Sequence, residues 1–296
     1  MHDHPHGHAY GGGDARRLRL ALALILGFMA AEIVVGILAH SLALLSDAAH
    51  MLTDAGALAM SLVVLRLAAQ PARGNRTFGL RRSEILSAQA NGAALLVLAG
   101  LIVYGAVRRL VSPPNAHGGA ILVVALVGIG VNLLATWQLA GANRRSLNIE
   151  GSFQHVLNDL FAFIATAVAG GVILATGWVR ADAVAALVVA GLMLRASWRL
   201  LRDSGRVLLD IAPVGLPVNE IGSAMVGHPG VVEVHDLHVW EVTTEFPTLS
   251  AHVLVEPGAD CHGIRRELEA LLRDRFGLEH TTLQIEHAPA KLVQIR

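Results

Sequence analysis

Two short strings of the sequence carry metal-binding residue types at one repeated spacing. His50-Met-Leu-Thr-Asp54 and His155-Val-Leu-Asn-Asp159 each place a histidine four residues before an aspartate. In a helix of 3.6 residues per turn, positions i and i+4 lie on one face, so each string offers an imidazole and a carboxylate side by side. Two imidazoles and two carboxylates complete the tetrahedral shell that zinc favours. The pattern predicts a four-ligand metal site formed by His50, Asp54, His155 and Asp159.

The elements that must hold these ligands are apolar helices. Of the 296 residues, 54% are hydrophobic and 16% are charged, and the mean hydropathy of +0.55 is above the range of soluble globular domains. Each apolar stretch is near the roughly 20 residues that cross a ~30 Å hydrocarbon core. We predict six transmembrane helices, at about 18–39, 41–66, 85–107, 118–140, 150–176 and 181–201.

The two ligand pairs have matching depths in these predicted helices. At 1.5 Å per residue, Asp54 lies about 20 Å from the outer end of the second helix, and Asp159 roughly 15 Å from the inner end of the fifth. Both carboxylates therefore fall between the midplane and the inner face. Either pair alone would fit a packing or helix-end role equally well. Two pairs favour a shared site, because ionisable groups inside a bilayer normally face a polar cavity or one another.

Other polar residues in the apolar helices leave alternatives open. Asp47 is on the stripe of His50 and could accept a hydrogen bond from a ligand imidazole, or it could belong to the start of the helix. Glu32 and Asp182 could line an ion or proton path or bond between helices, whereas Asn132 favours hydrogen bonding between helices.

The chain changes character near Val207. From there onward it has 13 acidic and 6 basic residues, against 10 and 17 before. Short elements replace long apolar ones, with helices expected near 217–227 and 262–276 and strands near 231–242, 248–256 and 281–287. The predicted fold is an α-helical membrane protein with a small α+β domain. We predict a His-rich cytoplasmic N-terminal tail (1–17), a six-helix transmembrane domain (18–205) and a cytoplasmic C-terminal domain (206–296).

The charges of the connecting segments predict the orientation in the membrane. Nine arginines fall on one side of the six helices and three on the other, and excess positive charge marks the cytoplasmic side. Both termini are therefore expected inside. The N-terminus does not have the pattern of a signal peptide. Cys261 is the only cysteine, which excludes an intramolecular disulfide.

Four segments resemble the cation diffusion facilitator family of metal transporters. They are Gly36–Asp54, Arg76-Thr-Phe-Gly-Leu-Arg-Arg-Ser-Glu84, Asn148–Asp159 and His235-Asp-Leu-His-Val-Trp240. The resemblance implies a homodimeric bacterial inner-membrane antiporter, not an enzyme. It would export zinc, and often cadmium or cobalt, in exchange for protons by alternating access, with the first four ligands above as its transport site. The expected partners are divalent metal ions and the lipid bilayer, with no nucleic acid.

The same resemblance implies a metallochaperone-like soluble domain that mediates dimer contact and often binds further ions. By position, His235, His252 and Glu286 resemble ligands of that second site, with His262 as a fourth. Gln284 stands where some family members have a histidine, and a neutral amide oxygen is a poor zinc ligand. Regulatory zinc binding and ordinary surface or core histidines therefore both remain open.

Two further groups of residues have metal-binding side chains. The tail histidines His2, His4, His6 and His8 could collect zinc or have no role, and Cys261 is expected to be inert.

Two rival functions are disfavoured by the sequence. An intramembrane metallohydrolase is disfavoured because the chain has no His-Glu-x-x-His motif. A membrane-anchored metal sensor is disfavoured because an anchor has no reason to keep charged pairs in two spans.

Overall fold

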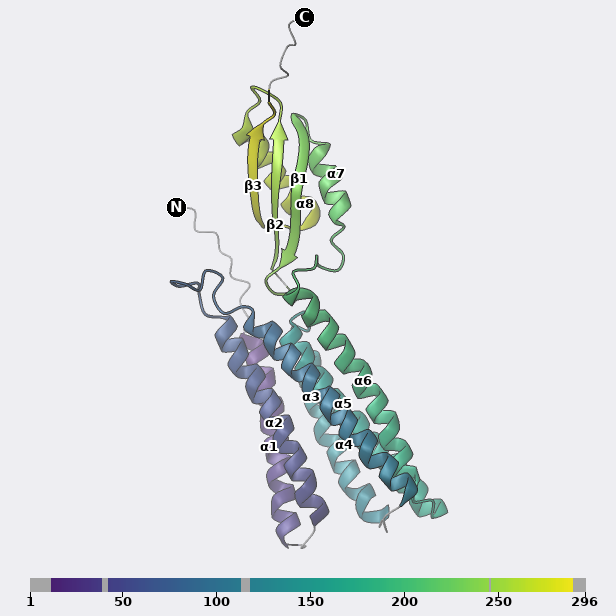
Figure 1. The fold of residues 1–296 in the computed structure, drawn as a ribbon. Coiled ribbons are helices and arrows are strands. Elements are labelled where there is room, and N and C mark those ends of the chain that lie inside the picture. The colour runs from purple at the N-terminus through teal and green to yellow at the C-terminus, as the bar shows by residue number, and fades with distance from the viewer. Residues whose placement is uncertain (1–11, 39–41, 113–117, 245, 290–296) are drawn as a thin grey trace, which may run out of the picture. The chain divides into compact units, whose positions relative to one another are not determined.

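The computed structural model describes residues 12–38, 42–112, 118–244 and 246–289. The chain divides into two compact units, Met1–Ser204 and Gly205–Arg296. The first unit is built from long helices and the second from three strands and two shorter helices (Figure 1).

The first unit contains six long helices. Among the described residues, four of them, the last four in chain order, are long and apolar enough to cross a membrane. That all six helices cross the membrane stays a prediction. The helices are α1 (Gly12–Leu38), α2 (Leu42–Ala68), α3 (Ser83–Val111), α4 (Gly118–Ala140), α5 (Leu147–Thr176) and α6 (Ala181–Leu208).

Helix α5, which carries the second predicted ligand pair, has well-defined ends. Its N-cap is Ser146, whose hydroxyl accepts a hydrogen bond from the backbone N–H of Ile149. Its C-cap, Gly177, has a left-handed φ of 71°, and its N–H donates to the carbonyl of Ile173. Glu150 in the first turn accepts hydrogen bonds from Arg144 and Arg199. These caps and ion pairs fix the ends of α5 locally.

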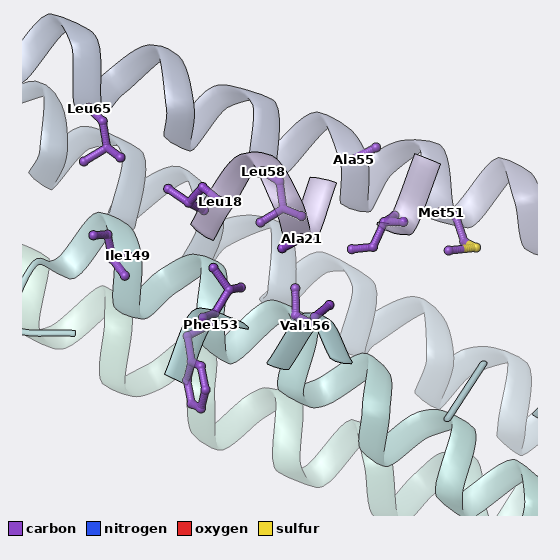
Figure 2. Packing of buried hydrophobic residues seen from close by; sticks show 12 residues of the cluster. Leu18, Ala21, Met51, Ala55, Leu58, Leu65, Ile149, Phe153 and Val156 are labelled. Carbon is purple, nitrogen blue, oxygen red and sulfur yellow. The ribbon is translucent and has the colours of Figure 1, made fainter. Parts of the chain in front are cut away.

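Helices α1, α2, α4 and α5 share one apolar core. Its buried side chains come from all four helices, and most of those from α1, α2 and α5 are labelled in Figure 2. In this core, Met51, Ala55 and Leu58 of α2 lie in the same part as Val156 of α5 (Figure 2). The core therefore packs together α2 and α5, the two helices that carry the predicted ligands. A second cluster joins α3 to α6, with Leu95 and Ala99 against Val189, Met193, Ala196 and Leu200.

The second unit is a three-stranded sheet covered by helices on one face. Strand β2 (Pro247–Val255) is central, antiparallel to β1 (Val231–Glu241) and parallel to β3 (His280–His287). The alternating residues Leu249, Ala251, Val253 and Val255 of β2 pack against α7 (Val218–Val226) and α8 (Cys261–Phe276). The even-numbered residues of β2, including His252, therefore point to the opposite face.

Asp260 caps helix α8. Its carboxylate accepts hydrogen bonds from the backbone N–H groups of His262 and Gly263. The bond from Gly263 is the main cause that lowers the pKa of Asp260 below its usual value, and the bond from His262 and the charge of Arg266 add to it. This capping fixes the start of the helix on which His262 lies.

Candidate metal centre

Three of the four predicted transport ligands lie together inside the helical unit. One ligand atom from each of Asp54, His155 and Asp159 lies within 4.8 Å of the other two. Asp54 comes from α2, and the other two come from α5, one helical turn apart. Among the described residues, this is the only group of three or more His, Cys, Asp or Glu with that proximity. The histidine and aspartate at i and i+4 on α5 thus combine with Asp54 to form a local set of nitrogen and oxygen donors.

Asp54 and His155 contact each other directly. The Nε2–H of His155 donates to the carboxylate Oδ1 of Asp54 at 2.8 Å. The side chains are 3% and 5% exposed, so bulk water does not screen the contact. Among the described residues, Nδ1 of His155 has no hydrogen-bond partner. This buried imidazole therefore has one nitrogen engaged by a carboxylate and one without a partner.

His50 lies one helical turn before Asp54 in α2. Its side chain, like that of Asp47, lies outside the described residues. The helix places His50 and Asp54 at i and i+4, as the sequence predicts. That His50 completes the ligand set stays a prediction.

A cavity of about 110 Å³ opens beside the cluster. Asp54, Asp159 and Asn132 line it together with apolar side chains and Thr166. A water in the liquid occupies about 30 Å³, so the cavity has room for an ion with a few waters. The Nδ2 of Asn132 donates to Gly128 within its own helix, not to another helix as the sequence suggested.

The other acidic residues of the apolar helices lie elsewhere. Asp182 accepts a hydrogen bond from Nη1 of Arg109 at 2.6 Å, joining α6 to α3. It lines a second cavity of about 500 Å³, which shares the lining residues Ala162 and Thr166 with the cavity beside the cluster. Glu32 is buried in α1, with 4% of its surface exposed. Neither residue belongs to the three-ligand cluster.

Our sequence predictions omitted a group of buried polar residues next to the ligands. Ser61, Ser87, Asn148 and Ser152 hydrogen-bond with one another across α2, α3 and α5, and we call them the polar cluster. One signal was visible in the sequence, because Asn148, Ser152, His155 and Asp159 lie at successive spacings of four, three and four residues. That spacing puts them on one face of a helix.

In the second unit, His235 and His252 are neighbours across β1 and β2. They pair directly in the sheet, and their ring centroids are 5.4 Å apart. A register shift follows His235, and Asp236 within it has a left-handed φ of 53°. The carboxylate of Asp236 lies 4.0 Å from Nε2 of His252 and 3.0 Å from Nε2 of His238. The irregular strand thus gathers histidines and a carboxylate on an exposed face.

Glu286, Gln284 and His262 have different positions relative to this pair. Gln284 pairs with His252 in the sheet and donates from Nε2 to the carboxylate of Glu286 at 2.5 Å. His262 is exposed on α8, which covers the other face of the sheet. The two histidines His235 and His252 are therefore brought together, Glu286 is held by Gln284 in their neighbourhood, and His262 belongs to a different element.

Two family descriptions match this chain in sequence. Residues 18–209 match the cation efflux transmembrane domain, and residues 213–288 match the cation efflux protein, cytoplasmic domain. Together they cover nearly all of the described chain.

Several curated proteins are similar over almost the full length. The zinc transporter ZitB of Escherichia coli (strain K12) is 39% identical over 265 residues, which are 89% of this chain and 84% of ZitB. A cadmium, cobalt and zinc/H⁺–K⁺ antiporter of Bacillus subtilis (strain 168) is 36% identical over 89% of this chain and 86% of its own. The metal cation efflux system protein CzcD of Cupriavidus metallidurans is 38% identical over 89% and 84%.

One solved structure matches part of the chain. It is the metal-bound C-terminal domain of the CzcD transporter from Cupriavidus metallidurans, 31% identical, with a TM-score of 0.23. The match covers 23% of this chain and 96% of that structure.

Proposed function

The chain belongs to the cation efflux family of membrane transporters, and from this premise we propose that it exports divalent metal ions, chiefly Zn²⁺, in exchange for protons. Members of this family are transporters and not enzymes, so the chain is a multi-pass membrane protein that moves metal cations. The observation that carries the finer proposal is the buried proximity of Asp54, His155 and Asp159 on two helices. Cd²⁺ and Co²⁺ are further candidate substrates, since the Bacillus subtilis relative is named for all three ions.

The donor set supports zinc as the main substrate. One imidazole and two carboxylates are present in the cluster, and His50, one turn before Asp54, would supply a second imidazole. Nitrogen donors suit zinc, whereas an all-oxygen set suits manganese or magnesium. A shell of four protein ligands leaves no open position for a catalytic water, which argues against a metallohydrolase.

Proton exchange is supported by the bond between His155 and Asp54. The proton on Nε2 is shared with the carboxylate, so an ion that binds Nε2 must displace that proton. A proton and a metal ion compete for the same imidazole lone pair, so an acidic exterior favours release of the metal and neutral cytosol favours its binding. Metal and proton would thus alternate at the same donor atoms.

Transport also requires that the site face the two sides of the membrane in turn. We propose that α2 and α5, which carry the ligands, move together within the four-helix core during this cycle. The proposal places both termini and the second unit in the cytosol, at the bacterial inner membrane, because the arginine-rich connections lie on that side. A homodimer is proposed from the cytoplasmic-domain match of residues 213–288.

Everted inner-membrane vesicles test this function. We expect ATP- or respiration-energised vesicles to take up zinc and, when zinc is added, to release protons from their acidic interior, as reported by a pH-sensitive dye. Cd²⁺ and Co²⁺ added one at a time would give the ion ranking. Zinc uptake without any proton movement would contradict proton exchange. If no divalent ion were taken up, the proposed transport function itself would be contradicted.

We also propose that the exposed face around His235 and His252 binds a regulatory zinc ion. A second copy of the chain, or a rearrangement of Glu286, would complete the ligand set, because zinc needs about four donors within about 2.3 Å. Zinc there would offset the repulsion between two acidic domains, whose 13 acidic residues exceed 6 basic ones in each copy from Val207 onward.

His252→Ala should therefore reduce the zinc-dependent approach of two copies without altering the membrane site. The measurement is the distance between spin labels in the full chain, attached at Arg273→Cys in a Cys261→Ser background. His287→Ala is the matched control, because this exposed histidine of β3 bonds to the carbonyl of Glu256 outside the paired histidines. An unchanged zinc response in His252→Ala would leave the domain as a dimerisation element only.

A further inference from the structure

The polar cluster ties the two ligand-bearing helices to each other and to α3. Nδ2 of Asn148 in α5 donates to the carbonyl of Ser61 in α2 at 3.1 Å, and Ser87 Oγ of α3 donates to Oδ1 of Asn148 at 2.7 Å. The hydroxyl oxygens of Ser61 and Ser152 lie 2.6 Å apart. All four residues are at most 3% exposed. These contacts form one buried network, which begins within one turn of His155 at Ser152 and extends to two turns from the predicted ligands at Ser61 and Asn148.

The network lies at the same offset from both ligand residues. Ser61 follows Asp54 by seven residues in α2, and Asn148 precedes His155 by seven residues in α5. Because residue numbers rise along α2 while their α5 partners fall, the two helices are antiparallel at this contact. Seven residues span about 10 Å of helix, two turns, so both contacts lie on the facing stripes of the same helix pair.

Apolar packing alone would fix the register of α2 and α5 less strictly than packing combined with the hydrogen bonds of the polar cluster. Their shared core consists of Met51, Ala55, Leu58 and Leu65 with Ile149, Phe153 and Val156, and contacts among such side chains are not directional (Figure 2). Hydrogen bonds between buried groups are directional, and weaken steeply with length and misalignment. A slide of one residue, about 1.5 Å along the axis, would lengthen and misalign these bonds together.

We infer that Ser61, Asn148 and Ser152 are positioning residues of the transport site, which set the register that holds Asp54 against His155 and Asp159. This inference rests on the proposed transport site. The same slide would also lengthen and misalign the bond between Asp54 and His155, which is 2.8 Å long. The register therefore keeps the ligands assembled before the ion arrives. Preassembly raises the affinity for zinc, because binding does not then have to order the ligand side chains.

The inference is tested with serine variants of the full chain in proteoliposomes. Ser61→Ala and Ser152→Ala should each raise the KM for zinc about fivefold, the factor that one typical hydrogen bond supplies, with Vmax per folded molecule little changed. The double variant should show the same fivefold rise and not about twenty-five-fold, since both changes remove one shared contact. Asn148→Ala, which loses two contacts, should raise KM further.

Ser197→Ala is the matched control. Its buried hydroxyl donates to the carbonyl of Gly92 at 2.8 Å, which joins α6 to α3 and leaves out the ligand-bearing pair. It should leave the zinc KM unchanged even if it lowers thermal stability. An equal KM rise in Ser197→Ala and Ser152→Ala, or multiplying effects in the double variant, would reduce the polar cluster to general packing.

One additional variant separates this inference from the proposed function. Asp159→Asn removes a ligand charge and should abolish zinc transport. If it does so while Ser61→Ala and Ser152→Ala match the unmodified chain, the transport site stands and the positioning role is wrong. If Asp159→Asn transports zinc normally, the proposed function itself is wrong, and the positioning inference goes with it.

Discussion

Asp54→Ala or Asp159→Ala is expected to abolish zinc transport, lowering the initial rate at least about 100-fold while the protein still inserts and folds. Loss of an outer hydrogen-bond partner of a metal ligand already costs about 10- to 100-fold, so loss of a ligand should cost more. Without Asp54, Nε2 of His155 also loses its acceptor in a site that is almost fully buried. The measurement is zinc uptake into proteoliposomes, normalised to the amount of folded protein.

The isosteric changes and a remote carboxylate sharpen this test. Asp54→Asn and Asp159→Asn keep the shape of the side chain and remove its charge, so they should fail like the alanine variants if the carboxylate binds the ion. Asp14→Asn should transport normally, because Asp14 is a half-buried residue at the start of α1, away from the cluster, that accepts a bond from the Asn143 N–H. Full zinc flux in either Asp54 or Asp159 variant contradicts the shared site.

The secondary structure followed from the sequence because each element has a strong local signal. The predicted spans at 118–140 and 181–201 begin where α4 and α6 begin, and the sheet strands are within one residue of their predicted bounds. Helix ends were less predictable where polar residues continue a helix into water. Helix α6 runs on to Leu208, and α1 begins at Gly12, inside the segment assigned to the tail.

The pairing of the ligands followed from spacing, but their support did not. A His-x-x-x-Asp string places its histidine and aspartate on one face of a helix. Because ionisable residues are costly inside apolar helices, two such pairs are expected to face one shared site. The partners of Asn148 lie 61 and 87 positions away in the chain, at Ser87 and Ser61. Serine and asparagine are common in membrane helices and bond to many partners, so no local rule identifies Ser61 as the acceptor.

The second unit shows the same limit in a sheet. The sequence predicts that His235 and His252 lie on separate strands, yet their direct pairing depends on the register of β1, which shifts between His235 and His238. Asp236 adopts its left-handed φ of 53° within that shift. Aspartate tolerates this conformation better than most residues, but a single sequence does not reveal where a strand uses it.

His155→Asp is expected to change the ion ranking as well as the rate. The variant exchanges the imidazole between Asp54 and Asp159 for a third carboxylate, so the described donors become oxygen only. Such a set suits harder ions, and a smaller proportion of nitrogen donors lowers the preference for zinc. We expect the KM for zinc to rise at least about tenfold and transport of Mn²⁺, relative to Zn²⁺, to increase.

The charge of the new side chain must be separated from its donor type. His155→Asn offers a neutral oxygen and should lose zinc transport without gaining Mn²⁺, since two carboxylates and an amide attract the ion less than three carboxylates do. His50→Asp makes the same exchange one turn before Asp54 and should shift the ranking in the same direction if His50 completes the shell. Initial rates for Zn²⁺, Cd²⁺, Co²⁺ and Mn²⁺ in one proteoliposome preparation give the ranking for each variant. An unchanged ranking in His155→Asp would mean that its imidazole does not bind the transported ion, and that its bond to Asp54 only orients the carboxylate.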